Sequence, residues 1–317
     1  MLYNTENRRA SLKVHAMTSI IIPTYNAGKQ MYRLCEALKS QTASSEIIVV
    51  DSSSSDRTVE IAESFGAKVF IVPTENFDHG GTRTLAGKAA KGDILVYMTQ
   101  DAVPFDNHSI ENITRPFEDQ GIAASFGRQL PYPDATEFGA HLRLFNYPEV
   151  SCIKSLEDRD MHGIRTAFIS NSFAAYRKTV LEGIGWFRRR LIMGEDVCAA
   201  AKMLLAGHKI MYVAEAMVYH SHDYTVLQEF KRYFDIGVFH QSERWIIDEF
   251  GKAEGEGIRY MHSLFALLGR RKKYYLIPEG VVRNTLKYIG YKLGQNYEKL
   301  PASMMHKCSM HAYFWDK

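Results

Sequence analysis

The 317-residue sequence predicts an α/β fold: a mostly parallel, Rossmann-like sheet with helices on both faces, followed by a C-terminal helical region. Three observations carry this prediction. Apolar β-rich runs alternate with helical patterns over the first hundred residues, which is typical of βαβ units. Residues 47–50 are continuously apolar, as strands buried on both faces are. From Thr225 onward the pattern is helical almost to the end.

The individual elements follow in chain order. Apolar β-rich runs predict strands at residues 19–23, 46–50, 68–72 and 93–98. Apolar residues at helical spacing predict intervening helices at 30–41, 58–65 and 81–91. The regularity then weakens, with strands expected at 122–126, 166–176 and 210–220 and a helix at 195–206. Residues 130–165 read as loop-rich, because Pro131, Pro133 and Pro148 act as breakers there.

This pattern divides the chain into three parts. We expect an N-terminal extension at 1–16, a catalytic domain at 17–224 and a helical region at 225–317. From Arg270 to the end there are ten Lys or Arg against three acids, a bias that favours an anionic partner such as a membrane surface. A solvated basic face and packing in a homodimer are the alternatives. We expect no nucleic-acid partner.

Other features bear on the compartment. The four cysteines are scattered without a Cys-x-x-Cys pair, so neither a disulfide framework nor a zinc ribbon is indicated. No segment reaches the apolar length of a membrane span, and the first 14 residues lack an apolar signal core. We therefore expect a cytoplasmic protein, peripheral on the inner face of the cell membrane.

Polar residues follow several predicted strands, at the edge where open parallel sheets bind ligands. They are Pro23, Thr24 and Tyr25 after the first strand, Asp51 and Ser53 after the second, Gln100 and Asp101 after the fourth, and His220 and His222 at the last. A tyrosine there can stack on a nucleobase, and a carboxylate with a histidine can hold a divalent metal. Because strand side chains alternate, we expect only one of the two histidines to face the site.

Structural alternatives exist for these residues. Asp51 and the serines that follow it can cap the helix near Thr58, and Asp101 can cap a turn before Pro104. A strand-end histidine is more often structural than a ligand. Their shared location, and no single residue, favours a site.

Two helix starts add candidate groups. The glycine-containing run 76–83 precedes a helix whose N-terminus favours phosphate, and Arg83 can add a charged fork. It is not a Walker loop, since no Gly-Lys-Ser/Thr follows. Glu195 and Asp196 begin a later helix about 100° apart, so only one of them can face a given substrate atom. The residue that faces the substrate can serve as a general base. Alternatively, the two acids only compensate the dipole at the start of the helix.

Together these motifs resemble glycosyltransferase family 2. The resemblance covers roughly residues 17–222 and rests on the runs 22–26, 50–56, 99–101 and 194–196 and on Arg83. It implies the GT-A nucleotide-diphospho-sugar transferase fold and inversion of the anomeric centre. The runs 77–83 and 99–102 look like the branch that uses a dTDP-linked deoxysugar to build bacterial surface polysaccharides.

The resemblance also implies roles for individual residues. Those for the nucleotide sugar are Pro23, Thr24, Tyr25, Asp51, Ser53, Arg83 and Gln100. Asp101 and His220 would ligate Mg²⁺ or Mn²⁺, although Thr99 stands where the family usually has a first Asp. Asp196 would be the base. Acceptor contacts are expected from Asn171, Trp186 and Glu195.

We therefore expect transfer of rhamnose from dTDP-rhamnose to a saccharide or lipid-linked acceptor, in a single displacement. A family 2 enzyme with another donor, such as a UDP-sugar, is the first alternative. A sugar nucleotidyltransferase would need a basic glycine-rich loop after the first strand, where Thr24, Tyr25 and Asn26 stand. A non-catalytic carbohydrate- or lipid-binding protein would need no base.

Overall fold

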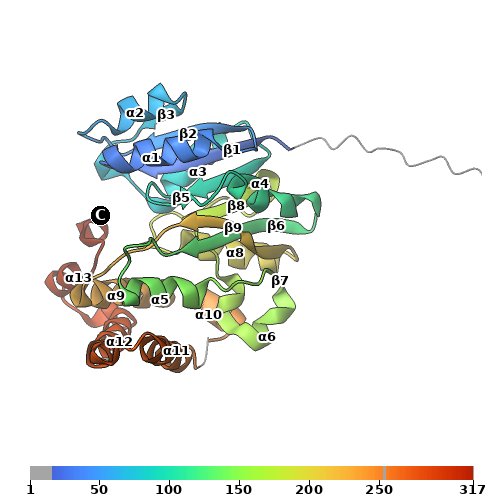
Figure 1. Ribbon diagram of the computed structural model, residues 1–317. Helices are drawn as coiled ribbons and strands as arrows, with labels where there is room; N and C mark the ends of the chain where they lie inside the picture. The colour runs from blue at the N-terminus through green and yellow to red at the C-terminus, as the bar shows by residue number, and fades with distance from the viewer. Residues whose placement is uncertain (1–15, 253–254, 317) are drawn as a thin grey trace, which may run out of the picture.

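The computed structural model describes residues 16–252 and 255–316, so the predicted extension at 1–16 lies almost wholly outside the described residues. A nine-stranded sheet has the order β3-β2-β1-β4-β8-β6-β9-β5, and β7 pairs with β9 (Figure 1). The strands are β1 Thr18–Thr24, β2 Ser45–Asp51, β3 Lys68–Ile71, β4 Ile94–Met98, β5 Val103–Pro104, β6 Ile122–Leu130, β7 Cys152–Lys154, β8 Phe173–Arg177 and β9 Lys209–Tyr219.

Helices surround this sheet and then form the C-terminal part of the chain (Figure 1). They are α1 Gly28–Lys39, α2 Thr58–Ser64, α3 His79–Ala89, α4 Ser109–Thr114, α5 Glu137–Asn146, α6 Arg159–His162, α7 Lys178–Gly183, α8 Glu195–Leu205, α9 Val226–Ser242, α10 Arg244–Phe250, α11 Glu256–Arg270, α12 Ile277–Gly294 and α13 Ala302–Cys308. Short 3₁₀ turns connect them, among them η4 Gly163–Ala167, η5 Tyr274–Leu276 and η7 Ala312–Asp316.

The first half of the sheet is parallel as predicted, and the second half is mixed. β1 pairs in parallel with β2 and β4, and the apolar residues of these three strands are almost all fully buried. β8, however, runs antiparallel between β4 and β6. The strand predicted at 166–176 is shorter in the structure. Its first residues form the end of η4 and a turn, and β8 begins only at Phe173.

This antiparallel strand matters for the site. Since β8 runs against β4, the residues just before β8 lie beside the carboxyl end of β4. The amide of Thr99 is accordingly 3.4 Å from the Ser172 carbonyl. Residues far apart in the sequence thus meet at one sheet edge.

The segment predicted as loop-rich contains helix α5. Thr136 caps it by accepting from the Gly139 amide. Pro133 precedes α5 and Pro148 follows it, so the prolines mark its limits and do not interrupt it. The prediction for 130–165 is wrong at this helix for that reason.

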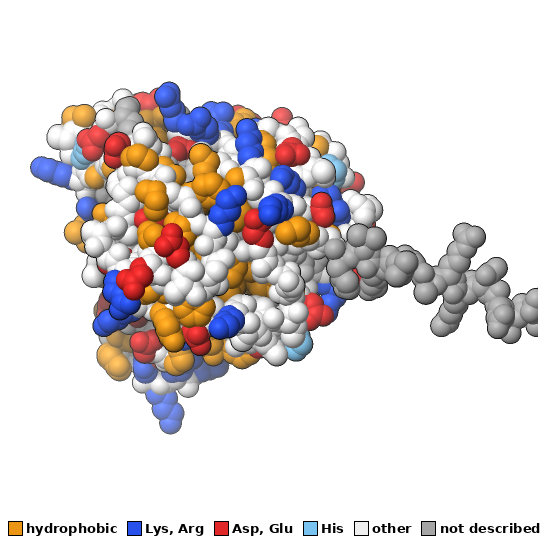
Figure 2. Space-filling model, turned by 90° about the horizontal axis from the view of Figure 1, so that it is seen from above, with side chains coloured by type: hydrophobic (Ala, Val, Ile, Leu, Met, Phe, Trp, Pro, Cys, Tyr) orange, Lys and Arg blue, Asp and Glu red, His pale blue; other side chains and the backbone are white. Residues whose placement is uncertain are grey.

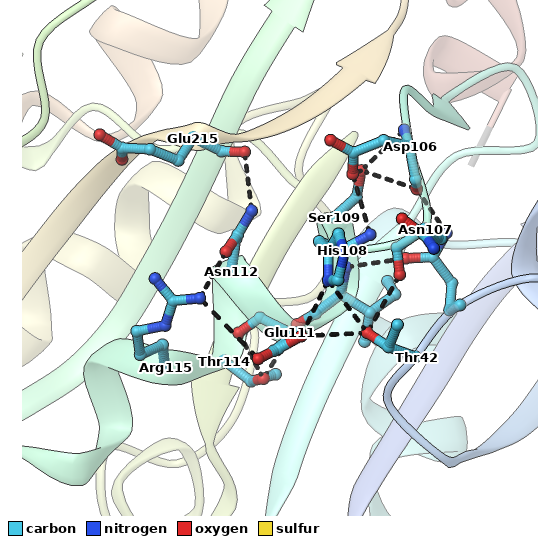
Figure 3. A network of polar contacts seen from close by, with 12 residues as sticks. Thr42, Asp106, Asn107, His108, Ser109, Glu111, Asn112, Thr114, Arg115 and Glu215 are labelled. Carbon is cyan, nitrogen blue, oxygen red and sulfur yellow. Dashed lines mark hydrogen bonds and ion pairs between the residues drawn. The ribbon is translucent and has the colours of Figure 1, made fainter.

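A polar network fixes α4 against β9 (Figure 3). Ser109 Oγ donates to the Met217 carbonyl at 2.7 Å, and Asn112 Nδ2 donates to the Glu215 carbonyl at 3.1 Å. At the other side, Thr42 Oγ1 donates to Glu111 at 3.0 Å. These bonds hold the last part of β9, which leads directly to His220.

The C-terminal helices pack closely on the sheet domain. Gly290 and Gly294 of α12 face the backbone of α9 at Phe230 and Phe234, where any added Cβ would collide with a carbonyl oxygen. Phe234 and Phe239 of α9 belong to the same buried apolar cluster as residues of β1, β4 and β8. Helix α9 therefore shares the core of the sheet domain.

The surface of the sheet domain carries mixed charge. Seen from the side of α2 and β3, Lys and Arg are interspersed with Asp and Glu and with exposed apolar side chains (Figure 2). Within the described ranges, none of the helices has the length and apolar character needed to cross a membrane.

Candidate active site

The ends of β1 and β2 form a tightly bonded loop pair. Thr24 Oγ1 and Ser54 Oγ donate to Asp51 Oδ1 at 2.9 and 2.6 Å, and the Ser54 amide donates to Oδ2 at 2.7 Å. Asp51 is fully buried. It does not cap α2, because Asp56 accepts from the Thr58 amide instead. The Asp51 carboxylate thus sets the shape of both loops.

Two other predicted nucleotide residues lie at the surface of this pair. Tyr25 is 52 % exposed, and its amide donates to Gln100 Oε1 at 2.8 Å. Ser53 is exposed in the left-handed region at φ 59°, and its hydroxyl donates to the Val72 carbonyl at 3.1 Å. Pro23 is half-buried at the end of β1. An open tyrosine ring above a rigid loop can stack on a planar base.

Asp101, His220 and His222 form a cluster with metal-ligand chemistry. The two Nε2 atoms lie 3.4 and 3.5 Å from Asp101 Oδ2, and one ligand atom of each residue lies within 4.8 Å of the others. The expectation that only one histidine faces the site is wrong. Side chains two positions apart in an extended segment point to the same side, so alternation itself places His220 and His222 together.

Burial lowers the pKa of both imidazoles, to about 4 for His222. Both rings are therefore neutral near pH 7, as metal ligation requires. One carboxylate oxygen and two imidazoles can hold a first-row transition-metal ion such as Mn²⁺, whereas Mg²⁺ prefers oxygen ligands. The residues present thus suit the ion that the sequence implied, with His222 added to the set.

Two further residues orient this cluster. Gln129 Oε1 lies 2.8 Å from His220 Nδ1 and accepts from Arg143 Nη1 at 2.6 Å. With Nδ1–H donating to that oxygen, His220 Nε2 keeps its lone pair for the cluster. Gln129 Nε2 also donates to Ser170 Oγ at 3.1 Å, which connects the cluster to the residue before Asn171.

Glu195 and Asp196, at the start of α8, have different environments. Glu195 is buried, 3.2 Å from Arg83 Nη1, and accepts from Asn171 Nδ2 at 3.0 Å. Asp196 is only half-buried and accepts from the Asn171 amide at 3.0 Å and the Val197 amide at 2.8 Å. Glu195 is thus engaged internally, whereas Asp196 is the carboxylate open to a substrate.

Burial, and then the neighbouring Glu195 carboxylate, raise the pKa of Asp196 to about 6. A carboxylate with this pKa is ionised at neutral pH and is a stronger base than an ordinary aspartate. These properties suit removal of a proton from a hydroxyl.

Arg83 lies on α3, which begins two residues earlier than predicted because Asp78 is its N-cap. Its Nη1 donates to the His79 carbonyl at 3.1 Å as well as pairing with Glu195. The buried Nε–H has no hydrogen-bond partner within the described part of the chain. The guanidinium therefore keeps one donor for a ligand oxygen.

The predicted acceptor residues are placed differently. Asn171 is buried and holds both carboxylates of α8. Trp186 is 8 % exposed, in the left-handed region at φ 64°. It lines a cavity of about 870 Å³ with Lys88, Arg189 and Lys202. Trp186 therefore faces a cavity beside α3, and the structure shows no contact between it and the Asn171 group.

Sequence reasoning missed Gln129, Arg143 and the role of His222. Gln129 lies near the end of β6, a position that suggests a site only when the strand order is known. Arg143 lies on α5, which had not been predicted.

Comparisons with known proteins show the family of the chain. Residues 19–185 match Glycosyl transferase family 2. The O-antigen chain rhamnosyltransferases RfbN of Salmonella typhimurium and WbaN of Salmonella anatum are 43% and 42% identical to the chain over 301 residues. Each alignment covers 94% of the chain, and 96% and 95% of the two relatives.

Solved structures share the fold at low identity. The mannosyltransferase PcManGT from Pyrobaculum calidifontis, in complex with GDP-Man and Mn²⁺, matches at TM-score 0.63 and 15% identity, over 90% of this chain and 88% of that one. S. aureus TarS 1-349 with UDP-GlcNAc matches at TM-score 0.52 and 15% identity, over 89% and 91%. The predicted GT-A fold is confirmed, and the chain belongs to glycosyl transferase family 2.

Proposed function

We propose that this protein transfers rhamnose from dTDP-rhamnose to a saccharide or lipid-linked acceptor during bacterial surface polysaccharide synthesis. Its end-to-end similarity to two O-antigen chain rhamnosyltransferases supports the sugar and the process. The observation that carries the chemistry is the open Asp196 carboxylate, held by Asn171, whose neighbour Ser170 is bonded through Gln129 to the Asp101 and histidine cluster.

In this proposal one side of the site binds the metal and the nucleotide, and the other side holds the base. Asp101, His220 and His222 would hold Mg²⁺ or Mn²⁺, which would offset the charge of the departing diphosphate. Tyr25 and Gln100 bind the nucleotide, whose base stacks on the exposed ring. Arg83 directs its free Nε–H toward a phosphate oxygen.

Asp196 removes the proton from an acceptor hydroxyl. As that oxygen forms its bond to the anomeric carbon, the bond from this carbon to the diphosphate oxygen breaks, and the nucleoside diphosphate leaves. A single displacement of this kind inverts the anomeric centre. Asn171 and Glu195 position Asp196: one donates to its carboxylate and the other raises its pKa.

We further propose that a surface formed by η5 and α12 contacts the membrane. Its exposed apolar and aromatic side chains are Tyr274, Tyr275, Val281, Val282, Tyr288 and Ile289. Arg270, Lys272 and Lys292 are exposed on the same elements or directly beside them. We name this set the α12 face. Basic residues beside amphipathic aromatics suit a peripheral position on an anionic cytoplasmic leaflet.

Fewer basic residues are available for this contact than the composition predicted. Arg283 and Lys287, two of the ten basic residues counted from Arg270 onward, are buried and pair with Glu229 of α9 at 3.1 Å each. Arg271 and Lys273 both pair with Glu137 of α5 at 2.7 Å. These four residues take part in helix packing, so the basic contribution rests on fewer residues.

The donor is tested by release of nucleoside diphosphate. We expect release from dTDP-rhamnose with Mn²⁺, and none in excess EDTA. Preferential turnover of a UDP-sugar would support the alternative donor, and full activity in EDTA would remove the metal from the proposal. Formation of dTDP-rhamnose from dTTP and a sugar phosphate would identify a nucleotidyltransferase instead.

A further inference from the structure

The last described residues, Ser309 to Asp316, run from the end of α13 to the start of α3, which lies near the other end of the sequence. We call residues 309–316 the C-terminal strap. Tyr313 Oη lies 3.3 Å from His79 Nε2, across 234 positions of the chain. In Figure 1 the C-terminal end accordingly lies away from the lower helices, at the level between α13 and α1.

The strap is anchored by one set of groups. The Met310 amide donates to Asp235 Oδ2 of α9 at 3.0 Å, and Ser309 is buried. The Trp315 ring packs 5.6 Å from Tyr297 and 6.5 Å from Phe234, measured between ring centroids. These contacts hold the strap without His311 or Tyr313.

The other set faces α3. The His311 ring lies 5.5 Å from His79 and 5.8 Å from Tyr313, and Phe77 lies 5.0 Å from His79. Phe77, His79 and His311 are partly exposed, and Tyr313 is 40 % exposed. Four aromatic rings, three of them with polar edges, thus form a half-open surface, which we call the strap cluster.

A continuous polar chain joins the strap cluster to the base. His79 Nδ1 lies 3.5 Å from Arg83 Nη1, and Arg83 pairs with Glu195 at 3.2 Å. Asn171 then bonds both Glu195 and Asp196 at 3.0 Å. The buried Arg83 Nε–H, unpartnered within the described residues and assigned above to a phosphate oxygen, lies in the middle of this chain, so the strap cluster and the donor phosphate meet at Arg83.

We propose that the strap cluster is part of the acceptor subsite and binds the sugar ring whose hydroxyl Asp196 deprotonates. A pyranose presents a C–H face that packs on aromatic rings, and hydroxyls that bond the Tyr313 and imidazole edges. The other donor groups lie on the β1, β2 and β4 ends, whereas the strap cluster joins the site through Arg83, Glu195 and Asn171. This inference rests on the proposed function.

The test separates transfer to sugar from transfer to water. dTDP-rhamnose and Mn²⁺ are supplied with a panel of p-nitrophenyl monosaccharide glycosides, and glycoside product and free rhamnose are both quantified. For Tyr313→Ala and His311→Ala we expect the ratio of transfer to hydrolysis to fall about tenfold or more, the loss typical of one good contact. Hydrolysis itself should change less than about twofold.

Two further variants control for structure. Tyr313→Phe keeps the ring and should recover part of the ratio. Asp316→Asn alters the same strap at a carboxylate that faces His306, and should leave the ratio unchanged. Thermal unfolding temperatures should agree among all four variants within a few degrees.

An unchanged ratio in both alanine variants, or loss of hydrolysis in parallel with transfer, overturns the inference and assigns the strap a structural or donor-side role. A wild type that hydrolyses the donor but transfers to none of the sugars overturns it as well. A wild type that does not hydrolyse dTDP-rhamnose at all contradicts the proposed function instead.

Discussion

Neighbouring residues of the same chemical type do different work in this site. Glu195 and Asp196 are adjacent carboxylates. Glu195 is buried and pairs with Arg83, whereas Asp196 keeps an open face and has a raised pKa. The sequence predicted that only one of the pair faces the substrate. It could not show that the other would be a buried ion-pair partner, because Arg83 lies 112 positions away.

The pKa of Asp196 sets a pH dependence. The base must be ionised. The logarithm of kcat/KM, plotted against pH, should therefore fall with unit slope below about pH 6 and level off above it. Removing the Glu195 charge should lower the pKa of Asp196, so in Glu195→Gln the acid limb should move to lower pH. A profile that is flat down to pH 4.5, measured by donor turnover, would contradict Asp196 as the titrating base.

The metal cluster predicts graded losses. Asp101→Ala should abolish Mn²⁺-dependent protection by dTDP against thermal unfolding, because it removes the only carboxylate of the cluster. His220→Ala should weaken protection more than His222→Ala, since His220 is buried and oriented by Gln129. His262→Ala, at an exposed histidine of α11, serves as control. Unchanged protection in Asp101→Ala would remove this cluster as the metal site.

At the scale of elements, the first four strands and three helices matched their predicted positions within a few residues, because their apolar patterns are strong and local. β8 and α5 did not. Residues 166–172 read as β-rich but turn, and α5 is hidden between prolines. Both misses affect the site: β8 brings Asn171 to the edge of β4, and α5 carries Arg143.

The parallel pairing of β6 and β9 places Gln129 beside the end of β9, which makes it a positioning residue for His220. Gln129→Ala should weaken Mn²⁺ affinity by about 10–100-fold, the usual effect of losing the partner that orients a ligating histidine. Direct titration with Mn²⁺ measures this. The matched control is Arg128→Gln, which changes the residue just before Gln129 in β6. The Arg128 side chain pairs with Glu149. Equal affinity in both variants would show that His220 needs no such support.

At the scale of the whole molecule, the C-terminal helices belong to the catalytic unit through the shared core around Phe234 and Phe239. The C-terminal strap contacts α3 across 234 positions and α9 across 75 positions, and such contacts leave no local sequence signal. For this reason the strap cluster was not predictable, whereas the basic composition of the same region was.

The α12 face predicts binding to anionic membranes. The protein should sediment with vesicles containing phosphatidylserine, and binding should fall with salt. Changing Arg270, Lys272 and Lys292 to Gln should reduce it, since each basic residue near such a surface contributes about 1 kcal/mol.

The matched control changes Lys68, Lys91 and Lys209, which are exposed on other elements, and alters net charge equally. If both triple variants bind alike, the α12 face does not dock on the membrane. If the wild type stays in the supernatant at low salt but is dimeric by sedimentation velocity, the homodimer alternative takes its place.

Catalysis by this protein, as proposed, depends on a metal-binding side and a separate base. The most direct test compares Asp196→Asn with the wild type in two measurements: protection by dTDP and Mn²⁺ against thermal unfolding, and rhamnosyl transfer. We predict unchanged protection and a loss of about 10²–10⁴ in transfer rate, as expected for removal of a general base. Transfer at the wild-type rate by Asp196→Asn, with Glu195→Gln inactive but still protected by dTDP and Mn²⁺, would contradict the assignment.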